Sequence, residues 1–169
     1  MSEQCCPPEK GAATCEAPAT PQKALCPSCR QPGKSIDAIT LKAMLAVPLT
    51  ELRAVEYRFC RTPDCPTVYY SVDGEQQFAA EALREPVHQK HPTADNVFVC
   101  YCFRHSPATI RAELLATDHS GAVERITAGI EAGQCACEIR NPQGSCCLGN
   151  VRAVVQSLEA DLQRQEVQG

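Results

Sequence analysis

Cysteine content constrains this chain more than any other feature, because 13 of its 169 residues are cysteines. Its first residues, MSEQCCPPEKGAATCEAPATPQK, have neither the basic region nor the apolar stretch of a secretory signal. Cysteine-rich chains without an export signal hold metal more often than they form disulfides. An odd number of cysteines also leaves one thiol over in any scheme made of disulfides alone. We therefore expect a cytoplasmic, metal-binding protein.

Charge and hydropathy exclude two classes of partner. The formal net charge of −4 at pH 7 gives no basic surface for nucleic acid or anionic lipid. No apolar run approaches the roughly 18 residues that a membrane-spanning helix needs, so we expect no membrane association. The sequence also lacks a phosphate-binding loop and any Ser–His–Asp grouping, and it predicts no enzyme active site.

Composition divides the chain into a tail and two modules. Residues 1–23 are rich in Pro, Ala, Glu and Lys without apolar periodicity, which predicts a disordered tail. Residues 24–90 carry two separated cysteine pairs and predict a zinc-binding module, and residues 86–96, PVHQKHPTADN, are typical of a linker. Residues 96–167 read as strand, helix, helix, cysteine-rich loop and helix. The expected fold class is α+β, with a small zinc-ribbon-like β module that includes a helix, followed by a helical module.

The two cysteine pairs of the first module have the spacing of zinc knuckles. They lie in CPSC and FCRTPDC, and the four thiols are Cys26, Cys29, Cys60 and Cys65. A thioredoxin-like redox pair is the first alternative, but Pro32 and Gly33 oppose the helix that such a pair would open. Four unligated core cysteines are the second alternative, although the neighbouring prolines indicate turns. A closed site of four cysteines would stabilise the fold and leave no open position for hydrolysis.

Secondary structure around these pairs is also predictable. The run SIDAITLKAMLA predicts a helix that Ser35 would cap, with Ile39, Met44 and Leu45 on its apolar side. The segments EYRFC and PTVYY predict the two strands of a hairpin around the second cysteine pair.

The second module begins with NVFVCYCFRHSP, in which a strand would send Cys100 and Cys102 to the same face. A helix should follow, with Ser106 as its N-cap and Pro107 at its first position. Its apolar side would comprise Ile110, Leu114 and Leu115. Gly133 should end a second helix within SGAVERITAGIEAG. A last helix carries an apolar stripe of Val151, Val154, Val155, Leu158 and Leu162. Three short helices bury little, so we expect a cofactor where their ends meet.

The pattern of VCYCF, IEAGQC and CCLGNV resembles the bacterioferritin-associated-ferredoxin (BFD) type of 2Fe–2S domain. A zinc-knuckle module ahead of such a domain is similar to the amino-terminal region of CopZ-type iron–sulfur copper chaperones. The segments TLKAML, YRFCRTPDCPTVYY and NPQGSCCLGNV strengthen this likeness, which spans residues from about 25 to 160. The resemblance implies one mononuclear zinc and one redox-active 2Fe–2S cluster, rather than an enzyme.

The resemblance also implies which thiols hold the cluster: Cys100, Cys102, Cys135 and Cys147. The fourth position stays open, because Cys146 and Cys137 are alternatives to Cys147. Cys147 is favoured because it would directly precede the last helix and keep the apolar stripe in register. A second zinc on the same thiols is the competing hypothesis, since zinc also takes four cysteines.

The chain departs from a full copper chaperone in having no M-x-C-x-x-C loop. Its remaining thiols, of which Cys5, Cys6 and Cys15 lie in the tail, are soft ligands for Cu(I). The expected function is one-electron transfer or redox sensing in copper or heavy-metal handling, including reduction of Cu(II) to Cu(I) for a metal carrier. The expected partners are metal ions together with a chaperone, exporter or redox protein. A non-redox two-zinc adaptor or a metal-sequestering protein is the alternative.

Overall fold

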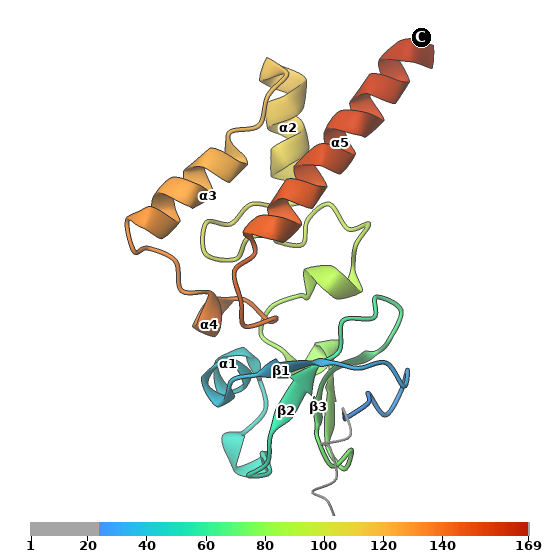
Figure 1. Cartoon of the computed structure of the whole chain (residues 1–169), viewed down its shortest axis with the longest axis vertical. Helices are drawn as coiled ribbons and strands as arrows, with labels where there is room; N and C mark the ends of the chain where they lie inside the picture. The colour runs from blue at the N-terminus through green and yellow to red at the C-terminus, as the bar shows by residue number, and fades with distance from the viewer. Residues whose placement is uncertain (1–23, 169) are drawn as a thin grey trace, which may run out of the picture.

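The structure is a computed structural model that describes residues 24–168. The predicted tail, residues 1–23, lies outside the described residues. A four-stranded sheet with helix α1 forms one end of the molecule, and helices α2, α3 and α5 form the other end (Figure 1). This arrangement confirms the α+β fold class. No described helix combines the length and the apolar character that crossing a membrane requires.

The sheet is an antiparallel meander in the order β1-β2-β3-β4. Its strands are β1 (Lys34–Ile36), β2 (Tyr57–Phe59), β3 (Thr67–Ser71) and β4 (Gln77–Ala79). Strands β2 and β3 pair with Phe59 opposite Tyr69, which confirms the predicted hairpin around the second cysteine pair. The strands are short, and a common core with α1 (Ala38–Met44) holds them together through Leu41, Met44 and Tyr69.

The predicted cap and apolar side of α1 are partly wrong. Ser35 lies in β1 opposite Arg58, so pairing between strands claims the residue expected to cap the helix. Asp37 takes the N-cap position without a side-chain hydrogen bond. Ile39 is 58% exposed, whereas Met44 and Leu45 are buried as expected.

The helical module contains α2 (Pro107–Thr117), α3 (Ala122–Glu131), α4 (Cys137–Arg140) and α5 (Leu148–Gln168). Ser106 caps α2 by accepting a hydrogen bond from the Thr109 amide, and Pro107 is its first residue, as predicted. Gly133 follows α3 with φ +68°, a conformation that glycine adopts without strain. Both α2 and α3 pack on the apolar stripe of α5, where Val151, Val155 and Leu158 are buried.

The predicted strand before α2 is wrong. Cys100 forms only an isolated bridge with His105, and no described strand pairs with residues 97–103. The chain turns back on itself here, because the Cys100 and His105 backbones exchange two hydrogen bonds of 3.1 Å. Arg104 adopts φ +57° in this turn. Leu115 was also expected on the apolar side of α2 but is 66% exposed.

The segment between the modules is packed against both. Three short 3-10 helices, η1 (Leu49–Glu51), η2 (Ala80–Ala82) and η3 (His88–Lys90), complete the first module and this connection. Val87 lies within the core of the sheet. The Tyr101 phenol donates to the Pro86 carbonyl oxygen and accepts from the His88 amide, at 2.7 and 3.0 Å. The segment therefore ties the start of the helical module to the sheet.

Candidate metal centres

The structure brings four predicted thiols, from two distant segments, into one group. Their Sγ atoms all lie within 4.8 Å of one another, and the residues are Cys26, Cys29, Cys60 and Cys65. The Cys26–Cys65 and Cys29–Cys60 sulfur pairs are 3.7 and 3.6 Å apart. Sulfurs of a tetrahedral zinc site lie about 3.8 Å apart, given Zn–S bonds of about 2.3 Å. The spacing of the sulfurs therefore fits one zinc ion.

Two tight turns present these thiols. In the first turn, the Cys26 amide donates to Gln31 and the Arg30 amide donates to Cys26, both at 2.9 Å, while Arg30 adopts φ +59°. In the second turn, the Cys60 amide donates to the Val68 carbonyl oxygen at 2.8 Å, so the Cys60 thiol lies directly after the last residue of β2.

Polar contacts attach these turns to the rest of the fold. The Tyr70 phenol accepts from the Gly33 amide and donates to the Ala24 carbonyl oxygen, each at 2.8 Å. Lys90 of η3 donates to the Thr62 carbonyl oxygen at 2.7 Å. The geometry of the thiol group is therefore built into the sheet and the connecting segment.

The thiols of this first group differ in acidity. Burial raises the pKa of Cys65 to about 12 and also raises the pKa of Cys60. Burial acts in the same direction on Cys29, but hydrogen bonds from Thr62 and from the backbone near Gln31 outweigh it and lower the pKa of Cys29 to about 6. The metal-free group at pH 7 therefore holds a thiolate at Cys29 and protons on Cys60 and Cys65.

The helical module gathers a second group of thiols. The Sγ atoms of Cys102, Cys135 and Cys137 all lie within 4.8 Å of one another. Cys102 is 4.0 Å from Cys135 and 3.8 Å from Cys137, and the last two are 3.3 Å apart. The Ala136 amide donates to the Cys102 sulfur at 3.3 Å, which holds the Cys135–Cys137 segment against Cys102.

Cys100 and Cys147 are buried beside this group and beside each other. Cys147 directly precedes α5, and its carbonyl oxygen accepts the Val151 amide, as expected from the sequence. The four thiols implied by the resemblance are thus in one region, and Cys137 is there as a fifth. Cys146 is exposed and lies outside both groups.

Sequence reasoning underestimated Cys137. It treated this residue as one alternative for a single position, whereas the structure places it next to three other thiols. The available signal was its spacing, because Cys135 and Cys137 repeat the C-x-C spacing of Cys100 and Cys102.

Interactions among these thiols spread their acidities widely. The neighbouring Cys147 thiol lowers the pKa of Cys137 to about 5 and the pKa of Cys100 to about 7. The same contacts raise the pKa of Cys147. Burial raises the pKa of Cys102 to about 12 and also raises the pKa of Cys135. At pH 7 Cys137 is therefore a thiolate and Cys100 is partly ionised, and both share hydrogen bonds with protonated neighbours that must release protons when a cation binds.

Apolar side chains enclose the second group. Val99 is buried next to Cys100, and both belong to the core beneath α2 and α5. Phe103 follows Cys102 and packs so closely on α3 that only a glycine fits at position 129. Phe98 contacts Tyr101 edge-on and lies under the Arg104 guanidinium, 4.3 Å from its ring centre. This packing shields Cys100, Cys137 and Cys147 from water, while Cys102 and Cys135 are partly exposed.

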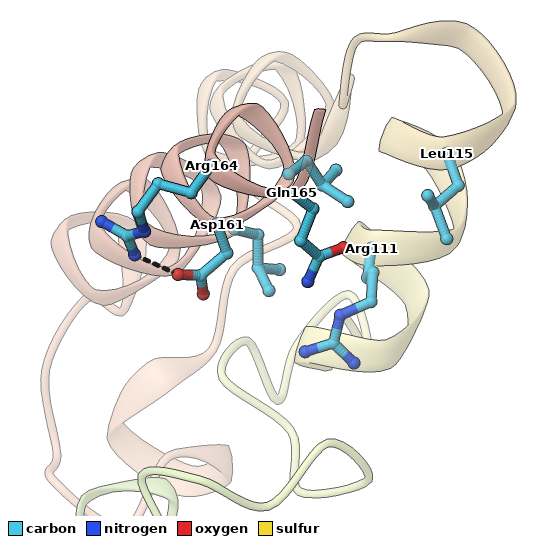
Figure 2. Close-up of a pocket in the computed structure, with 7 residues that line it drawn as sticks. Arg111, Leu115, Asp161, Arg164 and Gln165 are labelled. Carbon is cyan, nitrogen blue, oxygen red and sulfur yellow. Dashed lines mark hydrogen bonds and ion pairs between the residues drawn. The ribbon is translucent and has the colours of Figure 1, made fainter. Parts of the chain in front are cut away.

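A groove of about 420 Å³ between α2 and α5 contains none of these thiols (Figure 2). Figure 2 shows Arg111 and Leu115 on one wall and Asp161, Arg164 and Gln165 on the other. Arg164 forms an ion pair with Asp161 on its own helix. The lining of this groove includes no cysteine or histidine.

Comparison with known proteins supports the zinc-binding character of the first module. Residues 23–84 match the family model zf_CopZ, described as a zinc binding domain. No curated protein matches the chain. A solved structure, the X-ray structure of the Archaeoglobus fulgidus CopZ N-terminal domain, superposes with a TM-score of 0.64 and 24% sequence identity. The match covers 77% of this chain and 96% of that chain. The chain therefore has a CopZ-like fold, and its first module matches the model of a zinc-binding domain.

Proposed function

We propose that this protein is a two-centre metalloprotein that transfers single electrons in copper or heavy-metal handling. A structural zinc ion would bind to the first thiol group, and a 2Fe–2S cluster would bind to the second. One observation carries the cluster assignment: two further buried thiols, Cys100 and Cys147, lie beside but outside the compact group of Cys102, Cys135 and Cys137.

The first thiol group fits zinc. Its sulfur–sulfur distances of 3.6 and 3.7 Å are close to the edge of a ZnS₄ tetrahedron, and three of its four residues are buried. The sheet has its own core of aromatic and aliphatic side chains, separate from the small cluster of Cys26, Cys60, Cys65 and Tyr70. Zinc would therefore organise the two turns, while the sheet core would persist without the ion.

The second thiol group fits a 2Fe–2S cluster, which needs four thiolates, two for each iron. Cys100 and Cys147 would serve one iron, and Cys102 with Cys135 or Cys137 would serve the other. A 2Fe–2S cluster supplies reversible one-electron chemistry when it is bound. The chain would contribute the thiolates, the Ala136 amide on the Cys102 sulfur and the apolar enclosure. The N-terminus of α5 at Cys147 would favour the negative charge of the bound group.

Metal handling is the cellular role that we propose for this electron transfer. The CopZ-like fold supports it, as do the soft thiols beyond the two centres. Cys146 is exposed at the edge of the helical module and is a candidate for Cu(I). The tail thiols Cys5, Cys6 and Cys15 are candidates of the same kind, outside the described residues. The reaction would reduce Cu(II) to Cu(I) in the cytoplasm for a separate chaperone or exporter.

A non-redox adaptor with two zinc ions is the second candidate. The compactness of Cys102, Cys135 and Cys137 favours it, because three sulfurs within 4.8 Å of one another also suit one tetrahedral ion. Cys147 would then be the fourth ligand, and Cys100 would have no metal.

Reduction of the anaerobically purified protein distinguishes these functions. A 2Fe–2S protein should bleach on addition of dithionite, give an electron paramagnetic resonance signal of one spin per cluster, and recover its colour on reoxidation. With its free thiols blocked, the reduced protein should also convert added Cu(II) to Cu(I), detected with a Cu(I)-specific chelator, in a ratio of one copper per cluster. A zinc-loaded protein without colour and without reducing equivalents would refute electron transfer.

A further inference from the structure

Cys137 is a fifth thiol in a region where a 2Fe–2S cluster needs four. It opens α4 and is 6% exposed, so it is not a surface thiol that happens to lie nearby. Its sulfur lies 3.8 Å from that of Cys102, and the sulfur of Cys135 lies 4.0 Å from the same atom. The Cys135 and Cys137 sulfurs are therefore at nearly the same distance from the sulfur of Cys102, the proposed ligand that either thiol would join on one iron.

The backbone does not favour one of the two thiols over the other. The Ala136 amide between them donates to the Cys102 sulfur, so the backbone contacts Cys102 midway between Cys135 and Cys137. Cys135 comes directly before that amide and Cys137 directly after it, and their sulfurs are 3.3 Å apart. A displacement of 3.3 Å, the distance between these two sulfurs, would move an iron–sulfur bond from one cysteine to the other without rebuilding the fold.

The surroundings of the two thiols differ and so explain why both are present. Cys137 is buried beside Cys147, which links it to the ligand proposed for the other iron. Cys135 is partly exposed and follows the end of α3 at Gly133. One thiol is thus held by packing, and the other is positioned by the end of a helix.

From this geometry we infer that Cys135 and Cys137 are alternative ligands of the same iron. Either thiol completes the set formed by Cys100, Cys102 and Cys147, and the other remains unligated beside the cluster. The inference rests on the proposed function, because it presupposes that the second group binds a 2Fe–2S cluster.

The test compares Cys135→Ala, Cys137→Ala and the double variant in the full-length protein. Iron and sulfide per chain are measured after anaerobic reconstitution, and the reduced cluster is examined by electron paramagnetic resonance. Each single variant should keep its iron within about twofold of the wild type, and the double variant should lose at least about tenfold. The two single variants should give different g values, because each fixes a different ligand on the iron.

Matched controls separate ligation from folding. The Cys102→Ala/Cys137→Ala variant should lose the cluster as the first double variant does, because only three of the described thiols in this region, Cys100, Cys135 and Cys147, remain. Cys146→Ala should behave as the wild type, because its exposed thiol lies outside the group. Zinc content and the circular dichroism spectrum report whether each variant has folded. Cys135→Ser and Cys137→Ser provide the same comparison if an alanine variant does not fold.

Two kinds of failure are distinguishable. Loss of iron from one single variant, with the other unchanged, would identify a sole ligand and overturn the inference. Retention of the cluster by the double variant would overturn it as well. A wild-type protein that takes up no iron or sulfide would instead refute the proposed function itself, and the inference with it.

Discussion

The Tyr69 phenol donates a buried hydrogen bond of 2.5 Å to the carbonyl oxygen of Pro142. Tyr69 lies in the sheet of the zinc-binding module, and Pro142 lies in the loop between Cys137 and Cys147. Gly144 of the same loop rests on Ile36 and Thr40, and α4 packs on α1 (Figure 1). The loop that carries the proposed cluster ligands is therefore supported by the zinc-binding module.

Removing the Tyr69 hydroxyl should weaken this support. Tyr69→Phe leaves the buried Pro142 carbonyl without this donor, which should lower the free energy of unfolding by about 1–3 kcal/mol. The variant should also release iron faster to a chelator, because the ligand loop loses its anchor. Denaturant unfolding and the rate of iron loss measure the two effects.

Tyr57→Phe is the matched control, because its phenol donates to the Gln76 side chain and not to the loop. It should leave the rate of iron loss unchanged. Equal rates for Tyr69→Phe and the wild type would show that the sheet does not steady the cluster loop.

A side chain at Gly144 should disturb the same contact. Gly144 adopts φ +64°, and an added Cβ would lie 2.9 Å from Ile36 Cδ1 and 3.0 Å from Thr40 Oγ1. Gly144→Ala should therefore cost about 1–2 kcal/mol for the backbone and a further amount for the contact.

Gly133→Ala isolates the backbone part of this cost, since Gly133 has a similar φ of +68° with open space around its Cβ position. Thermal unfolding of both variants measures the difference. If the two substitutions lower the melting temperature equally, the packing of the loop on α1 contributes nothing.

Gly129 determines where Phe103 lies beside the second thiol group. A Cβ at position 129 would overlap the Phe103 ring, so Gly129→Ala should displace the ring that follows Cys102. The displaced ring should admit water and shift the visible spectrum and the reduction potential of the iron-loaded protein. Gly149→Ala is the control, since it also lies in a helix but its added Cβ meets no atom within 4 Å. Identical potentials for both variants would contradict this role of Phe103.

Zinc binding should release protons at neutral pH. Zinc takes thiolates, but Cys60 and Cys65 have raised pKa values, the latter about 12, so both are protonated at pH 7 without metal. Binding must release at least these two protons, and the affinity for zinc should therefore rise by at least roughly 100-fold per pH unit near pH 7. Cys29, with its pKa lowered to about 6, contributes little at this pH.

Calorimetry in buffers of different ionisation enthalpy counts the released protons. The iron-loaded, zinc-depleted protein is the sample, because its second thiol group is already occupied. Release of fewer than about one proton at pH 7 would contradict these acidities.

The features that sequence predicted well depend on local chemistry. Ser106 and Pro107 start α2 because a capping hydroxyl and a fixed φ act within one turn. The stripe from Val151 to Leu158 predicted the buried side of α5 because helical periodicity is also local. The spacing of Cys26 and Cys29 predicted a turn that presents two metal ligands. The structure brings all four predicted thiols, those of Cys26, Cys29, Cys60 and Cys65, together.

The features that sequence missed depend on contacts between distant residues. Ser35 does not cap α1 because β1 pairs with β2, more than twenty residues later. Residues 97–103 form no strand because, within residues 24–168, no neighbouring strand lies there for pairing. Cys137 enters the second thiol group because the Ala136 amide binds the Cys102 sulfur, a contact across 34 residues. The contacts themselves are not visible in a window of the sequence, although the C-x-C spacing of Cys135 and Cys137 is.

Metal and sulfide analysis of the anaerobically purified protein distinguishes a protein with one zinc and one 2Fe–2S cluster from a protein with two zinc ions. We predict a red-brown protein with about one zinc, two iron and two sulfide per chain. A colourless protein with about two zinc ions per chain, unchanged after anaerobic reconstitution with iron and sulfide, would contradict it.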